Sequence, residues 1–206
     1  MHMMKRIAAS VLMAWGLSAC ALAVDEVDLS YKSQSQAVAI GGAENVVVKV
    51  NGTDARGSNR DRISVKKNGY GMEMAAIVPK QDVPTVVAQA IEQDLKARGF
   101  RIGQGQVFVL VDVTKFYNDF KVGAFVGQAV GEVLLNVQVM NAGGKLLYSK
   151  AYTGEHTVPD VFMASGSNAK EAVEGALGNA LARMMGDQYF IQALIEAARA
   201  GSAPIS

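Results

Sequence analysis

The chain has 206 residues, of which 20 are basic and 19 acidic, so its formal net charge is +1. Half of the residues are hydrophobic, which is enough for one packed domain, and the balanced charge without a basic block argues against nucleic acid as a partner. A single cysteine excludes a disulfide within the chain. The two histidines, His2 and His156, are too few for a histidine-rich zinc site.

The first residues have the pattern of a secretory signal. Lys5 and Arg6 precede an apolar run from Ile7 to Leu17, and small residues follow. The run has about ten residues, whereas a helix that crosses the hydrocarbon of a bilayer needs roughly twenty. We therefore predict that residues 1–19 are a cleaved lipoprotein signal peptide and not a membrane span.

The segment Leu17-Ser18-Ala19-Cys20 resembles the bacterial lipobox, in which the cysteine becomes the acylated N-terminus after cleavage. The modification needs a nucleophilic thiol, and Cys20 carries the only one. Two or three acyl chains, at about 0.8 kcal/mol per buried methylene, anchor a protein stably. Because Ala21 and not aspartate follows, we expect sorting to the outer membrane of a diderm bacterium, with the domain facing the periplasm. We expect diacylglycerol and an N-acyl chain on Cys20 and no other cofactor.

Residues 20–44 are small and polar, with a Ser-Gln stretch and a Gly-Gly pair. They predict a lipid-anchored tether, which would span roughly 80 Å if fully extended at about 3.3 Å per residue. Within it, Ala37–Ile40 could pack as an edge strand. The tether leads into one domain, residues 45–206.

In chain order, β-rich and alternating runs predict strands, and an apolar stripe at helical spacing predicts a helix that begins after Asp82 and stops at Gly99. Two of the strand pairs flank Asn-Gly and Asn-Ala-Gly-Gly turns and so predict hairpins. The expected strands are Asn45–Val50, Ile63–Lys67, Met72–Val78, Gln106–Lys115, Glu132–Met140 and Lys145–His156, and the first helix is Val83–Arg98.

The last third of the chain is predicted to be helical. A capping box of Asn168 with Glu171 would begin the first segment, and Gly186-Asp187 would separate it from a second. Together these elements predict an α/β (α+β) fold. We expect a two-layer sandwich with a mixed, mostly antiparallel sheet of about five strands and two helical regions on one face.

Several short motifs, with the lipobox, resemble the YajG-type lipoprotein family. They are Val48–Gly52 running into Asp54-Ala55-Arg56, and the segment Ala97–Gly103 that closes the first helix. The resemblance covers most of the mature chain and implies an outer-membrane lipoprotein of a family without an assigned activity. The glycine-rich stretch 123–131 and the longer polar tether depart from the family pattern.

Three arginines follow the first strand closely: Arg56, Arg60 and Arg62. Their planar donors could bind a carboxylate of a peptidoglycan fragment or another small anionic ligand. Asp54 and Asp61 lie in the same segment, so the alternative is that these carboxylates pair with the arginines and fix the loop. We favour this alternative.

Phe116, Tyr117 and Phe120 lie in a stretch that we interpret as a loop leaving a strand. Exposed aromatic residues commonly anchor protein contacts, so this stretch is our candidate partner surface. The alternative is that the rings fold over the edge of the core.

Gly123, Gly127 and Gly131 recur at every fourth residue, which on a helix would form one small-residue face. The stretch also contains Gln128 and Glu132, so a glycine-rich strand or loop is favoured. His156 lies beside Glu155 and could form an acid–base pair, but no nucleophile motif or second metal ligand accompanies it.

We therefore predict a non-enzymatic, lipid-anchored outer-membrane protein whose periplasmic domain binds an envelope protein. The alternative is a binding module for peptidoglycan fragments or another small anionic ligand, and a hydrolase that uses carboxylates is a third class. In every case the chain contacts the membrane through its anchor.

Overall fold

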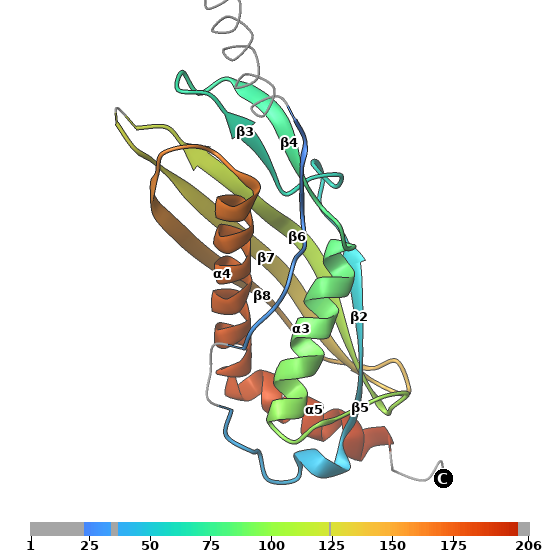
Figure 1. The fold of residues 1–206 in the computed structure, drawn as a ribbon. Coiled ribbons are helices and arrows are strands. Elements are labelled where there is room, and N and C mark those ends of the chain that lie inside the picture. The colour runs from blue at the N-terminus through green and yellow to red at the C-terminus, as the bar shows by residue number, and fades with distance from the viewer. Residues whose placement is uncertain (1–22, 34–36, 124, 202–206) are drawn as a thin grey trace, which may run out of the picture.

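The computed structural model describes residues 23–33, 37–123 and 125–201, and the predicted signal peptide and Cys20 lie outside them. The predicted α+β class is confirmed: a layer of helices covers one face of a large sheet (Figure 1). The sheet order is β5-β2-β6-β7-β8. Its strands are β2 (Val47–Asp54), β5 (Arg101–Ile102), β6 (Val107–Lys121), β7 (Gly127–Asn141) and β8 (Leu146–Val161).

The large sheet is mixed. β2 pairs in parallel with β5 and β6, whereas β6, β7 and β8 pair antiparallel. Side chains alternate between a buried and a partly exposed face along β6 and β7, as expected for a sheet covered on one side. The buried face is built largely of valines, which pack well on a pleated surface.

The helices are α3 (Val83–Ala97), α4 (Gly166–Met185) and α5 (Gln188–Gly201). As predicted, the Asp82 carboxylate caps α3 by accepting from the amide of Thr85, and Gly99 follows it at a positive φ of 96°. The capping-box prediction for α4 is wrong, because Ser165 is its N-cap and accepts from the amide of Asn168.

A smaller sheet has the order β1-β4-β3, with β1 (Asp25–Val27), β3 (Ser64–Lys67) and β4 (Glu73–Pro79). β3 and β4 form the predicted hairpin, and β1 pairs with β4 in parallel. The small sheet is attached to the large one through β6, since the amide of Asn118 donates to the carbonyl of Ile63 at 2.7 Å.

The described part of residues 20–44 does not form a free tether. Leu29 is buried, the Tyr31 hydroxyl donates to Asp94 Oδ2 at 2.7 Å, and the amide of Ile40 donates to the carbonyl of Arg98. The predicted edge strand at Ala37–Ile40 is not formed, and a short 3-10 helix follows at Ala43–Asn45. The small and polar composition of this segment wrongly indicated a free tether. A few larger side chains and backbone hydrogen bonds hold it against the domain.

None of the helices in the described residues is long and apolar enough to cross a membrane.

Candidate functional site

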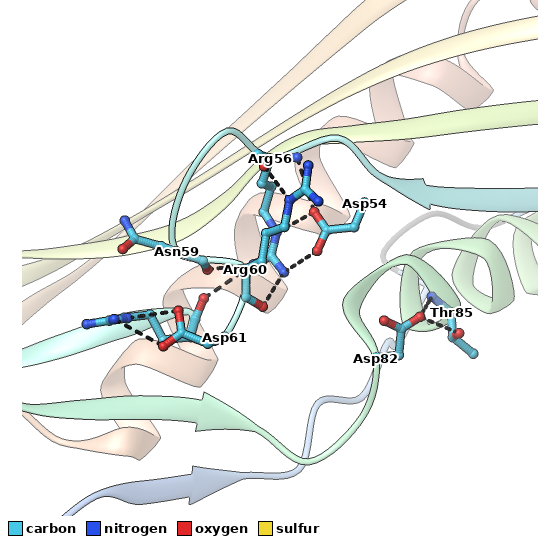
Figure 2. A network of polar contacts seen from close by, with 8 residues as sticks. Asp54, Arg56, Asn59, Arg60, Asp61, Asp82 and Thr85 are labelled. Atoms are coloured by element: carbon cyan, nitrogen blue, oxygen red, sulfur yellow. Dashed lines mark hydrogen bonds and ion pairs between the residues drawn. The ribbon is translucent and has the colours of Figure 1, made fainter.

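The arginine-rich loop after β2 is organised around Arg56, which is only 4% exposed. Its Nε and Nη2 atoms donate to Asp54 Oδ1 and Oδ2 at 2.9 and 2.7 Å, and its remaining donors reach the carbonyls of Asn59, Arg60 and Arg62 (Figure 2). Hydrogen bonds from Arg56 hold the pKa of Asp54 below its usual range. Arg56 therefore fixes the loop and does not present its guanidinium to a ligand.

The other two arginines are also engaged locally. Arg60 Nε donates to the carbonyl of Arg56 at 2.6 Å, and Arg62 pairs with Asp61 at 3.0 Å. The predicted carboxylate-binding set is thus not assembled, and the predicted alternative, pairing within the loop, describes the structure.

We expect Arg56→Ala to lower the free energy of unfolding by about 2 kcal/mol, because it leaves Asp54 and three loop carbonyls without their donor. Arg62→Ala, which removes an ion pair at the surface, should change it by less than about 0.5 kcal/mol. Urea unfolding of the mature chain carrying Cys20→Ser measures both. Equal effects of the two substitutions would contradict a structural role specific to Arg56.

The aromatic stretch lies within β6 and not in a loop, so the loop prediction is wrong, and the alternative, rings that pack on the core, holds for Phe116 and Phe120. The rings of Phe116 and Phe120 are buried in the core, and only Tyr117 is on the partly exposed face of the sheet. Burial, together with the nearby carboxylates of Glu73 and Asp119, raises the pKa of Tyr117. Phe116 and Phe120 cannot form a partner surface in this fold.

His156 lies on β8 with its ring against α4. A Cβ atom at Gly175 of that helix would overlap the imidazole ring, so the glycine makes room for the histidine. Among the described residues, no group of three or more His, Cys, Asp or Glu side chains is placed to hold a metal ion.

The structure contains a feature that the sequence did not indicate, a cleft at one end of the molecule that we call the end cleft. Its volume is about 620 Å³, within the usual range for small-molecule sites. Three connections meet there: the β3–β4 hairpin, the β6–β7 connection and the β8–α4 connection, all at the upper end in Figure 1. β1 contributes Asp25.

The charged side chains that line the end cleft are Lys66, Lys67, Lys121 and Asp25, and the carboxylate of Asp119, beside the lining, pairs with two of these lysines. Lys66 Nζ pairs with Asp25 at 2.7 Å, and both Lys67 and Lys121 contact Asp119, at 2.5 and 2.6 Å. Burial of Asp119 opposes its ionisation, but the hydrogen bonds from the two lysines outweigh it and hold its pKa below the usual range. Three cations against two anions leave one positive charge in excess.

The apolar part is unusually exposed. Among the described residues, eleven large hydrophobic side chains are exposed, and eight of them line the end cleft or flank its lining segments. Phe125 is 96%, Phe162 85% and Met163 76% exposed. The other five are Val24, Tyr70, Met72, Met74 and Val122.

Comparison with known proteins identifies the class. The model of a family described as uncharacterized lipoprotein matches residues 33–195. The chain belongs to this lipoprotein family, which confirms the resemblance to YajG-type proteins. A search of curated proteins found no match.

Solved structures are similar in fold. A crystal structure of a Xanthomonas campestris protein has a TM-score of 0.55 at 11% identity, covering 86% of this chain and 99% of that chain. A minor lipoprotein from Acinetobacter baumannii has a TM-score of 0.41 at 7% identity, covering 65% of this chain and 95% of that chain. At such identities only the first likeness supports an argument, and that argument concerns the fold alone.

Proposed function

We propose that the protein is a lipid-anchored, non-enzymatic binding module of the outer membrane, with its domain facing the periplasm. Its ligand is an amphiphile with a single anionic group, held in the end cleft. The observation that supports this proposal is the combination of lysines with exposed aromatic and thioether side chains around one cavity.

The two parts of the ligand correspond to two parts of the cleft. Phe125, Phe162 and Met163 lie among its lining residues and offer exposed apolar surface to an alkyl chain or ring. Lys67 and Lys121 share one carboxylate partner, Asp119, so together they have charge to spare for one anionic group of a ligand. This ligand belongs to the class of small anionic molecules that the sequence suggested, but the arginines are not its contacts.

Calorimetric titration of the unacylated mature chain tests the proposal. Decyl sulfate and decyl maltoside, each below its micelle concentration, share an alkyl chain and differ in charge. We expect decyl sulfate to bind more tightly, and Lys121→Gln to weaken it about tenfold, since a charge-assisted hydrogen bond contributes about 1.5 kcal/mol. Lys121 is well exposed, so its replacement leaves the fold intact.

Lys96→Gln, on the exposed side of α3, is the matched control and should leave the affinity unchanged. No binding of either amphiphile, or equal weakening by Lys96→Gln and Lys121→Gln, would contradict the assignment of the ligand to the end cleft.

A second candidate is the binding of an envelope protein, and a different surface favours it. The face of the large sheet opposite the helices carries partly exposed apolar side chains, among them Phe108, Leu110 and Leu134, which are typical of protein contacts. Tyr117 lies on this face. Photo-crosslinking from Tyr117 in living cells tests this candidate, since a discrete protein adduct would support it.

A further inference from the structure

The first described residues are fixed at the end cleft. Lys66 Nζ donates to the carbonyl of Ala23 at 2.9 Å and pairs with Asp25 Oδ1. The other oxygen of Asp25 accepts from the amide of Gly166, the first residue of α4, at 2.8 Å. Lys66 is itself buried, so this contact is part of the packed domain. The point at which the chain enters the domain is therefore well defined.

The anchor must lie close to this point. Three peptide units separate Ala23 from Cys20, and an extended chain covers at most about 3.5 Å per residue, which gives a reach of about 10 Å. If Cys20 is acylated, as the proposed function assumes, its lipid chains enter the bilayer within that distance of Ala23. The end of the domain that carries the cleft then has to lie at the membrane surface.

From this we propose that the end-cleft face of the domain docks onto the same bilayer that holds the anchor. The eight exposed hydrophobic side chains at this end would enter the boundary between lipid headgroups and acyl chains, with Phe125, Phe162 and Met163 contributing the most exposed surface. The opposite end, where β7 and β8 are joined, points away from the membrane (Figure 1). The long axis of the sheet is then inclined toward the membrane normal, and the cleft opens at the lipid surface.

The attraction is mainly apolar. The lysines at this end pair with Asp25 and Asp119, which leaves only one positive charge in excess to attract anionic lipids. A peripheral contact that depends on apolar side chains persists at high ionic strength, whereas one that depends on lysines weakens. Docking should therefore be nearly independent of salt.

Lipid-borne quenchers test the orientation. Since acylation consumes the single cysteine of the chain, a newly introduced cysteine is the only thiol that a fluorophore can label. We would label Phe125→Cys and Phe162→Cys in the protein made with its own signal and mixed with phosphatidylethanolamine–phosphatidylglycerol vesicles that contain brominated lipids. Leu146→Cys, an exposed apolar site at the opposite end, is the matched control.

We expect the label at residues 125 and 162 to be quenched at least threefold more strongly than at residue 146, in low salt and in 0.5 M NaCl alike. Equal, weak quenching at all three sites of vesicle-bound protein would overturn the docking alone. Protein that does not sediment with the vesicles would instead overturn the Cys20 anchor, and with it the anchoring part of the proposed function. Quenching that disappears in 0.5 M NaCl would overturn the apolar mode of docking.

Discussion

Gly154→Ala is expected to lower the free energy of unfolding by about 3 kcal/mol. Gly154 lies on the buried face of β8, under α4. A Cβ atom there would overlap the carbonyl oxygen of Ala176 and lie 2.5 Å from the amide nitrogen of Ala180, both in the helix backbone. Backbone atoms cannot rotate away as a flexible side chain can, so the helix would have to shift as a body.

Gly131 of β7 occupies an equivalent place, where a Cβ atom would overlap the carbonyl oxygen of Ala172 and lie 2.8 Å from the amide of Val173. Gly57, which has nothing within 4 Å of an added Cβ atom, is the matched control. Urea unfolding followed by circular dichroism, in the mature chain carrying Cys20→Ser, should show a large loss for Gly131→Ala and Gly154→Ala and almost none for Gly57→Ala. Losses of similar size at all three sites would contradict backbone contact as the cause.

The second large effect is expected at Asp187, between α4 and α5. Its Oδ2 atom accepts from Lys150 Nζ at 2.6 Å and from the hydroxyls of Tyr148 and Tyr152 at 2.8 and 3.1 Å, which fixes the helix junction to β8. The carboxylate side chain is only 7% exposed. We expect Asp187→Asn to lower the free energy of unfolding by about 3 kcal/mol, because it removes the charge from the acceptor of three hydrogen bonds at a side chain that is almost fully covered.

The Asp187 carboxylate also makes the free energy of unfolding depend on pH. The hydrogen bond from Lys150, followed by those from Tyr148, the amide of Tyr189 and Tyr152, holds the pKa of Asp187 well below its usual range despite burial, which acts in the opposite direction. An aspartate in the unfolded chain has a pKa near 3.9. The stabilisation that the ionised Asp187 contributes is therefore fully present above about pH 5, and it is lost as the pH falls through the pKa that Asp187 has in the folded protein.

Unfolding measured from pH 6 down to pH 2 should accordingly show a smaller loss of stability for Asp187→Asn than for the unmodified chain. Glu196→Gln, at an exposed position of α5, serves as the control and should follow the unmodified chain. Parallel pH curves for Asp187→Asn and the unmodified chain would show that this carboxylate does not link folding to pH.

Helix α3 shows what the sequence could predict. Its apolar stripe, the Asp82 cap and the stop at Gly99 are all local signals, and the predicted Val83–Arg98 agrees with the observed Val83–Ala97. The two hairpins were predictable for the same reason, since turn residues and alternation lie within a few positions of one another. The existence and order of these elements were therefore accessible, although the strands of the large sheet are longer than predicted.

The aromatic stretch shows where local reasoning failed. A bulge between Val113 and Lys115 adds one residue to β6, so the buried positions change from odd numbers such as Val113 to even ones such as Phe116. The two-residue alternation of buried and exposed side chains is interrupted at this bulge. Because Asn118 and Asp119 are polar, the part of the strand after the bulge resembles a loop in the sequence. The pairing with β7, which lies outside this segment, keeps the strand extended to Lys121.

The end cleft was beyond prediction for another reason. Its lining comes from three connections and from β1, which are separated by up to 140 residues and carry no shared motif. The apolar pair Phe162-Met163 was the one available signal, since two large hydrophobic residues in a connection between a strand and a helix are conspicuous. The parallel pairing of β1 with β4 brings residues 25–27 to the end cleft.

Native mass spectrometry of the mature protein, made with its own signal in a diderm bacterium and released in mild detergent, tests the anchor and the bound ligand together. We predict a chain that begins at Cys20, carries covalent acyl chains, and retains one anionic amphiphile, which the Lys121→Gln variant retains to a smaller extent. An acylated chain without bound amphiphile would contradict the proposed binding function. A chain that begins elsewhere, or carries no acyl group, would contradict the anchor itself.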